Sequence, residues 1–111
     1  MTDKGQQGAA RIQRQDTRSY GVQGAMTFDS VTDLWQQSAD MFSDEGVFQI
    51  DLAAVTRTDS AGLALLVEWL REASRRGARL EFLNMPEQMI SLASAANVEP
   101  LLMGERGASR S

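Results

Sequence analysis

A run of five small or polar residues carries the side chains best placed to do chemistry in this sequence: Thr58, Asp59, Ser60, Ala61 and Gly62. Asp59 and Ser60 supply a carboxylate and a hydroxyl, and the small residues after them leave the backbone open to close approach. The run separates a β-strand pattern from a helical pattern. Because the first N–H groups of a helix are free and carry partial positive charge, we expect this turn to bind anionic or hydrogen-bonding groups.

Ser60 also has a purely structural interpretation. Asp and Ser are favoured N-cap residues, and either Asp59 or Ser60 can satisfy the free donors of the following helix. A cap of this kind contributes roughly 1 kcal/mol to stability and needs no ligand. The pattern alone therefore leaves open whether Ser60 is a cap, a contact or both.

The composition argues against catalysis. The 111 residues include no histidine and no cysteine, so the commonest general base, the commonest metal ligand and any disulfide are absent. The sequence also lacks a glycine-rich phosphate-binding loop that ends in Lys and Ser or Thr. We expect a non-catalytic protein without a cofactor or a metal. An enzyme or small-ligand binder that uses Asp and Glu alone is the alternative.

Charge and hydropathy bound the cellular setting. The formal net charge of −4 argues against nucleic acid as the main partner. No apolar run approaches the roughly 20 residues of a membrane span, and residues 1–14 are polar, without the apolar segment of a signal peptide. We expect a soluble protein of the cytoplasm that does not insert into a membrane.

One domain is expected between two polar tails. Residues 1–9 and 104–111 are rich in small and polar side chains and read as disordered tails. The remaining residues, 10–103, are enough for one domain and too few for two.

The first elements of this domain are two strands and a helix. Residues 10–15 and 20–26 have the alternation of strands. A helix is expected from Ser30, which resembles a capping box together with Asp33. Its apolar positions recur at helical spacing and are Val31, Leu34, Trp35, Met41 and Phe42, with Trp35 placed in the core.

The elements on either side of the turn have stronger patterns. Residues 47–52 predict a strand that is covered on both sides, because Val47 adds an apolar residue to its second face. A helix follows the turn and runs to about Arg76. Gly77 then stands where a left-handed residue is expected to end it.

The C-terminal part predicts a strand, a helix and a short last strand. Residues 79–83 alternate as a strand does. Pro86 suits the first turn of the next helix, with Asn84 as a possible cap and Asn97 as its end. Residues 98–103 are expected to add a final short strand.

This order of elements predicts an α/β fold. Strand–helix–strand units imply right-handed crossovers and a largely parallel sheet. We expect a mixed, mostly parallel sheet of four or five strands. The chain is too short to cover both faces thickly, so the helices are expected mainly on one face.

The helix after the turn carries apolar residues outside its expected core stripe. On a helical wheel, Leu65 and Trp69 lie about 100° or more from that stripe. Together with Arg76 they have the composition of an interface hot spot. We expect all three to extend the partner-binding surface, unless the following helix covers the two apolar side chains. The expected stripe itself is Leu63, Leu66, Val67, Leu70 and Ala73.

Residues 55–93, VTRTDSAGLALLVEWLREASRRGARLEFLNMPEQMISLA, resemble the STAS domain, the family of anti-sigma factor antagonists and sulfate-transporter tails. Members carry a D-S/T-x-G-L turn before this helix, which Asp59, Ser60, Gly62 and Leu63 match. The resemblance extends over residues 20–102 and implies the STAS fold.

Within the family, the chain is most similar to the MlaB branch. The evidence is Ala64-Leu65-Leu66 after the turn and residues 24–28, GAMTF, before it. The resemblance implies a small STAS subunit that binds the MlaF-like ATPase of a phospholipid-transport ABC system, with Ser60 at the contact. The implied complex lies at the inner membrane with permease and substrate-binding subunits.

The antagonist branch is the alternative. Its members resemble this turn and use its Ser or Thr in regulation, so Ser60 would be the phosphoacceptor. A phosphate there is favoured by the helix dipole and repelled by Asp59, a combination that suits a switch. Ala61 departs from this branch, which usually has a second Ser or Thr at that position.

Overall fold

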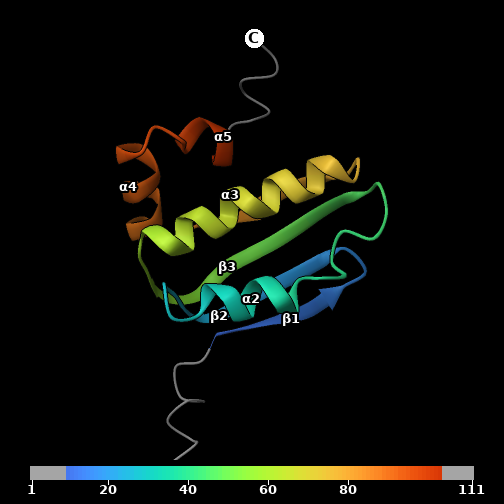
Figure 1. Cartoon of the computed structure of the whole chain (residues 1–111), viewed down its shortest axis with the longest axis horizontal. Coiled ribbons are helices and arrows are strands. Elements are labelled where there is room, and N and C mark those ends of the chain that lie inside the picture. The colour runs from blue at the N-terminus through green and yellow to red at the C-terminus, as the bar shows by residue number, and fades with distance from the viewer. Residues whose placement is uncertain (1–9, 104–111) are drawn as a thin grey trace, which may run out of the picture.

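Four strands and four helices make up the part of the chain that the structure, a computed structural model, describes: residues 10–103 (Figure 1). The strands are β1 (Arg11–Asp16), β2 (Ser19–Met26), β3 (Val47–Thr58) and β4 (Arg79–Leu83). The helices are α2 (Val31–Gln37), α3 (Ser60–Arg75), α4 (Glu87–Ala95) and α5 (Glu99–Met103). Both predicted tails lie outside the described residues.

The strands form one mixed sheet in the order β1-β2-β3-β4. β1 is antiparallel to β2, while β2 with β3 and β3 with β4 are parallel. The predicted α/β fold with a mostly parallel sheet is therefore confirmed. The parallel register sets Met26 beside Thr58, so the loops that follow β2 and β3 leave the sheet at the same edge.

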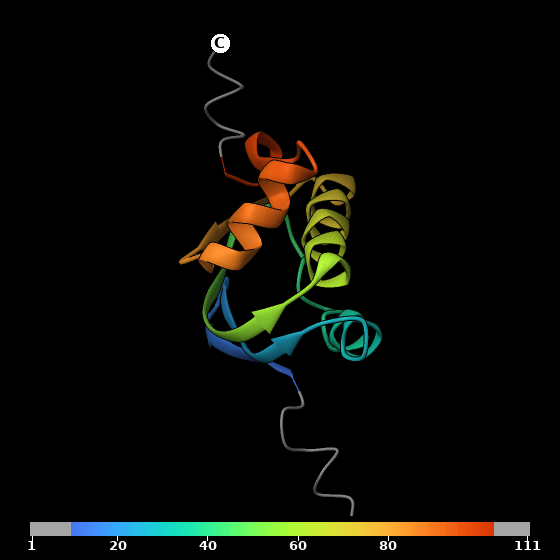
Figure 2. The same ribbon diagram turned by 90° about the vertical axis from the view of Figure 1, so that its left-hand side faces the viewer.

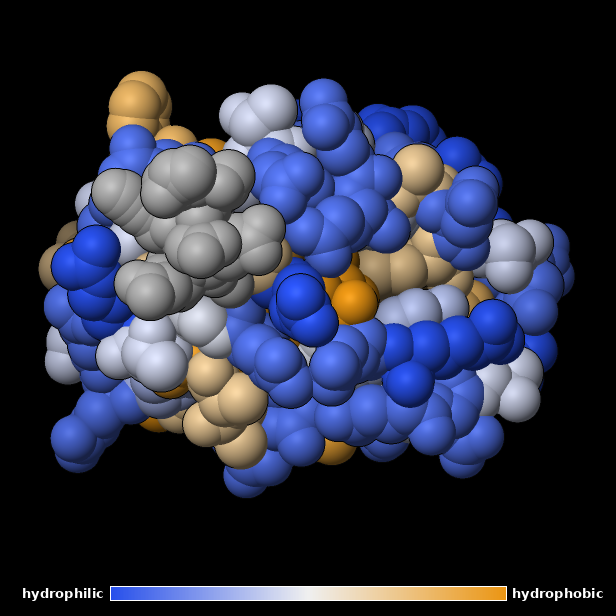
Figure 3. Space-filling view, turned by 90° about the horizontal axis from the view of Figure 1, so that it is seen from below, coloured by the Kyte–Doolittle hydropathy of each residue, from blue (hydrophilic) through white to orange (hydrophobic). Residues whose placement is uncertain are grey.

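The helices are arranged side by side, mainly on one face of the sheet, as predicted. α3 lies between α2 and the α4–α5 pair (Figures 1 and 2). The largest fully buried side chains come from all the layers and are Trp69, Phe48, Met26, Leu34, Ile50, Leu52, Leu66, Met89 and Val22. The face seen from below is mostly hydrophilic with a few apolar patches (Figure 3). No helix within residues 10–103 has the length and apolar character needed to cross a bilayer.

Two of the predicted boundaries before the turn are wrong. β3 continues to Thr58, and Val47 at its start is 48% exposed, because no helix covers that side of the strand there. α2 ends at Gln37, and Met41 and Phe42 are buried in the segment after it. The Ser38 hydroxyl, donating to the carbonyl of Trp35 at 2.7 Å, lies at this end of the helix.

The predicted capping box at Ser30 is also wrong. The Ser30 side chain makes no capping hydrogen bond to α2. Its hydroxyl instead accepts from the N–H of Thr27 at 3.0 Å and donates to the carbonyl of Ala25 at 2.7 Å. Ser30 therefore closes the loop between β2 and α2.

The C-terminal elements combine confirmed and incorrect predictions. Gly77 and Asn97 have left-handed backbones, with φ of 79° and 62°, and end α3 and α4 as expected. Asn84 does not cap α4, since Pro86 holds that position and the Asn84 amide donates to Asp51 at 3.0 Å. Residues 99–103 form a short helix and not a strand, so the sheet has four strands. Pro100, in the first turn of α5, is well suited to that position because it lacks an N–H group.

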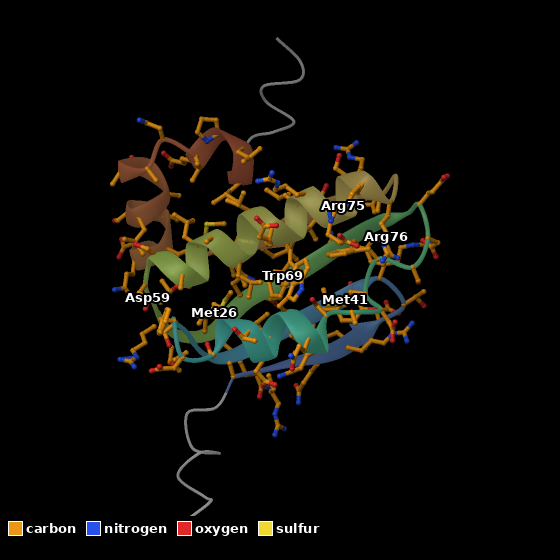
Figure 4. All side chains as sticks on the ribbon, viewed as in Figure 1. Met26, Met41, Asp59, Trp69, Arg75 and Arg76 are labelled. Carbon is orange, nitrogen blue, oxygen red and sulfur yellow. The ribbon has the colours of Figure 1, made fainter. Side chains whose placement is uncertain are left out.

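Leu65 and Trp69 belong to the core, contrary to the prediction that they extend an exposed surface. Leu65 is 5% exposed and Trp69 is 0% exposed. Trp69 lies between α3 and α2 (Figure 4), and its indole N–H donates to the hydroxyl of Ser38 at 2.9 Å. Trp69 is therefore covered by α2 and Ser38, which precede α3 in the chain, and not by the helix that follows α3. Trp35, expected in the core, is 39% exposed.

Trp69→Ala removes the largest fully buried side chain. We expect it to lower the free energy of unfolding by about 3–5 kcal/mol, the range for deleting a buried aromatic ring. Trp35→Ala is the matched control, for which we expect a loss of about 1 kcal/mol or less, because that ring is partly in solvent. Urea titrations followed by far-UV circular dichroism measure both. Equal losses would contradict the assignment of Trp69 to the core.

Candidate protein-binding site

The turn at residues 58–62 lies where two loops of the sheet meet. The backbone N–H of Asp59 donates to the carbonyl of Met26 at 3.4 Å, and its carboxylate Oδ2 accepts from the N–H of Phe28 at 3.1 Å. Figure 4 shows Asp59 at the start of α3, near Met26. The loop after β2 and the loop after β3 are therefore tied together through one residue.

Asp59, and not Ser60, is the N-cap of α3. Its Oδ1 accepts from the N–H of Ala61 at 2.9 Å and from that of Gly62 at 3.3 Å. The sequence left this assignment open between the two residues. With the Phe28 contact included, one carboxylate satisfies three backbone donors.

Thr58 and Gly62 are structural residues. Thr58 is buried, its hydroxyl donates to the carbonyl of Met26 at 2.9 Å, and its N–H donates to the side chain of Gln88 in α4 at 3.2 Å. A Cβ atom on Gly62 would lie inside contact distance of Thr58 Oγ1 and of the Met26 carbonyl oxygen. Because the latter is a backbone atom that cannot move aside, α3 approaches β2 this closely only with glycine at this position.

Ser60 is the one residue of the turn that is exposed. Its hydroxyl makes no hydrogen bond to any other residue between 10 and 103, and Ala61 beside it is only partly buried. The other residues of the turn hold the two loops and α3 in place. Ser60 is therefore presented to solvent on a support held by hydrogen bonds.

An apolar groove of about 490 Å³ begins at Ser60 and runs between α3 and α4. Helical spacing did not predict this groove, because it places Val67 in the core stripe. The Val67 side chain is in fact only partly buried. The small residues Ala64, Ala95 and Ala96 on neighbouring helices were the available signal. The groove is lined by Ser60, Leu63, Ala64, Val67, Glu68, Leu92, Ala95, Ala96 and Val98.

The groove continues along α3. A second hollow of about 420 Å³ shares Val67 with it and extends to Leu70, Ser74 and Leu101. Leu101 is 46% exposed. Val67, Leu70 and Leu101 thus continue the apolar lining along α3 away from Ser60, and Arg71 and Arg75 also line this second hollow.

Phe28 is a further candidate contact residue that the sequence pattern did not predict. It follows β2, is 78% exposed, and has its backbone held by Asp59. An aromatic ring this exposed beside a rigid turn is a feature of interaction surfaces, in which aromatic residues are enriched. Its signal in the sequence was a lone aromatic residue in a loop.

Arg76 does not join the turn. It lies at the opposite end of α3 from Asp59 (Figure 4) and its Nε donates to Glu72 at 2.8 Å. This hydrogen bond, together with Arg75 and against the effect of burial, lowers the pKa of the Glu72 carboxyl. The structure thus brings Thr58, Asp59, Ser60, Ala61 and Gly62 together and separates them from Leu65, Trp69 and Arg76.

The ionisation of Asp59 is linked to this geometry. Burial raises the pKa of its carboxyl, but the N–H groups of Phe28, Gly62 and Ala61, with the charge of Arg57, outweigh burial and hold the pKa below its ordinary value of 3.8. Folding therefore favours the ionised form. The resulting stability is fully present above the pKa of the unfolded chain and is lost as the pH falls through the folded-state pKa.

The described residues, 10–103, contain no group of three acidic side chains placed to hold a metal ion. What the turn offers is an exposed hydroxyl, an exposed aromatic ring and an apolar groove on a rigid frame. These features suit contact with another protein better than they suit bond-making chemistry.

Asp59→Ala removes the acceptor of three backbone donors. We expect it to lower the free energy of unfolding at pH 7 by about 1–2 kcal/mol, the range for loss of an N-cap. The difference from wild type is expected to shrink as the pH falls through the folded-state pKa of Asp59. Urea titrations from pH 7 down to about 2.5 measure this, with Asp40→Ala as the control for loss of an exposed carboxylate. A difference that is independent of pH would contradict the assigned role.

Solved structures share this fold at low sequence identity. The anti-sigma factor antagonist SpoIIAA in its unphosphorylated form has a TM-score of 0.66 and 15% identity, over 92% of this chain and 95% of that chain. The Bacillus cell fate determinant SpoIIAA in the phosphorylated form has a TM-score of 0.63 and 16% identity, over 92% of this chain and 98% of that chain. SLC26A9 has a TM-score of 0.64 and 12% identity over 72% of this chain, which spans only 16% of that chain.

Sequence comparison gives a more specific result. No curated protein sequence matches the chain significantly. The family described as Mlab, STAS domain, matches residues 13–103, which include the turn, the four helices and nearly all of the sheet. The chain therefore belongs to the STAS domain family, and the family model that it matches is the one described as Mlab.

Proposed function

We propose that the chain is a non-catalytic accessory subunit that binds the MlaF-like ATPase of a phospholipid-transport ABC complex. In this role it supports the assembly and activity of the transporter and thereby outer-membrane lipid asymmetry. The complex also contains permease and substrate-binding subunits, and it holds the chain in the cytoplasm, peripheral to the inner membrane. The match to the Mlab group supports this proposal.

The observation that carries the proposal is that Ser60 makes none of the contacts that hold the turn together. Asp59 caps α3, Thr58 and Gly62 fit α3 to the sheet, and Ser60 is left exposed at the mouth of an apolar groove. A partner that fills the groove removes apolar surface from water, which is the main favourable term in association. The Ser60 hydroxyl provides a specific contact at the end of the groove, and the exposed Phe28 ring, on the loop held by Asp59, provides another outside it.

The proposed mechanism is a bias on the ATPase and not a chemical step. A bound subunit changes the equilibrium between two states of its partner only by the difference in its affinity for them. A rigid turn suits this task, because little conformational entropy is lost when it binds. The ATPase supplies the nucleotide chemistry.

Ser60→Arg places a long charged side chain at the mouth of the groove. We expect co-purification of the tagged chain with the transport ATPase to be lost. The thermal midpoint is expected to stay within a few degrees of wild type, because Ser60 makes no hydrogen bond to the other described residues and Asp59 remains the cap.

Ser43→Arg is the matched control for this experiment. Ser43 is also exposed but precedes β3, at the opposite end of that strand from the turn. Binding is expected to survive this change. Unfolding of Ser60→Arg would show that Ser60 is mainly structural, and retained binding by a folded Ser60→Arg would refute the proposed contact.

A second candidate function is that of an anti-sigma factor antagonist switched by phosphorylation of Ser60. The observation in its favour is the exposed Ser60 hydroxyl at the N-terminus of α3, where the helix dipole stabilises a phosphate. The carboxylate of Asp59 opposes the same phosphate. Phosphorylation would then change the surface without unfolding it.

Identifying the proteins that co-purify with the chain separates the two functions. The transporter role predicts a stable complex with an ABC ATPase and an unmodified Ser60. The antagonist role predicts capture of a serine kinase that binds a sigma factor, with a phosphate on Ser60 detected by mass spectrometry of the intact protein and its peptides. Capture of the kinase without the ATPase would overturn the transporter proposal.

A further inference from the structure

The free edge of β1 is closed by side chains. Within residues 10–103, β1 pairs with β2 on one side only, and five of its six residues are exposed. Such an edge presents unpaired N–H and C=O groups to which another strand can bind. The side chains that cover this edge therefore indicate whether pairing with another strand is prevented.

The amide of Gln37, the last residue of α2, occupies the pairing position on this edge. Its Oε1 accepts from the N–H of Ile12 at 2.8 Å, and its Nε2 donates to the carbonyl of Ala10 at 3.3 Å. These are the two contacts that the peptide groups of one residue in a parallel neighbouring strand would make. One side chain thus takes the place of a strand.

The orientation of this amide is set by a third contact. Gln37 Nε2 also donates to Oδ2 of Asp33, one turn earlier in α2, at 3.0 Å. A carboxylate accepts hydrogen bonds and does not donate them. Nε2 therefore faces Asp33 and Ala10, which leaves Oε1 facing Ile12.

The other end of the edge is closed by Arg14. Its Nε donates to the carbonyl of Asp16 and its Nη2 to the carbonyl of Thr17, both at 3.3 Å. Side chains thus engage backbone groups near both ends of β1. Between them, Arg14 directs its own N–H toward the free edge, because it stands two residues after Ile12.

We propose that the free edge of β1 is a strand-pairing surface for a second copy of this chain, and that the Gln37 amide keeps it closed. Two copies related by a two-fold axis present their β1 edges antiparallel to one another. With Gln13 opposite its own copy, Ile12 lies opposite Arg14 and Arg11 opposite Gln15. No like charges then face each other directly, so the uncapped edges fit one another.

This surface is separate from the turn at Ser60, and the inference does not rest on the proposed function. It assigns Gln37 a role in specificity: it prevents two sheets from joining. Natural proteins protect exposed strand edges in related ways, with charges, bulges or covering segments.

Gln37→Met tests the inference, since it retains side-chain length and helix propensity but loses both edge contacts. We expect sedimentation velocity over a concentration series to show a dimer whose dissociation constant is at least about tenfold below that of wild type, because pairing no longer displaces the amides. Gln36→Met is the matched control. It adds the same apolar side chain at the neighbouring exposed position and is expected to leave association unchanged.

Arg14→Pro in the Gln37→Met background identifies the surface. Proline has no N–H to donate across the edge, and the pairing of β1 with β2 does not use this group, so we expect a folded monomer. Gln37→Ala repeats the test without a long side chain, and circular dichroism verifies the fold of every variant. The inference is overturned if Gln37→Met and Gln37→Ala associate no more than Gln36→Met, or if the dimer survives Arg14→Pro.

Discussion

The carboxylate of Asp59 is the contact on which the site depends. β2 and β3 are parallel neighbours, so their following loops leave the sheet together, and Asp59 accepts hydrogen bonds from the first turn of α3 and from the loop at Phe28. The close approach of α3 to β2 requires glycine at position 62. Ionised Asp59 thus orients the helix and the loop relative to each other, and the surface around Ser60 takes its shape from this arrangement.

The packing of the sheet and the helices determines which residues of α3 remain accessible on that surface. α3 contacts α2 on one side and α4 and α5 on the other, so it buries Leu65 and Trp69 as well as Leu63 and Leu66. The residues left accessible are those that point between the helices, such as Ala64 and Val67. A groove next to Ser60 follows from the small side chains there, because alanines on α3 and α4 leave space that larger residues would fill.

Much of the fold could be predicted from the sequence, because strand alternation, helical spacing and helix-ending residues such as Gly77 are local signals. The prediction that Leu65 and Trp69 extend an exposed surface was wrong for a physical reason. A helical wheel assumes one buried stripe, and the packing of α2 on α3 gives a second line of burial that no local pattern encodes. Residues 98–103 were misassigned because a run this short and apolar fits either a strand or a helix. The turn was selected correctly as a structural unit, but the sequence did not indicate that Asp59 also binds the loop at Phe28.

The separation of tasks within the turn has an evolutionary consequence. Under the proposed function, changes at Asp59, Thr58 or Gly62 alter folding and binding together, so selection on either property restricts them. Ser60 lies on the proposed contact surface without a hydrogen bond to the rest of the described domain. Position 60 is therefore where a lineage can exchange one partner for another, or gain a modification site, while the domain beneath it stays intact.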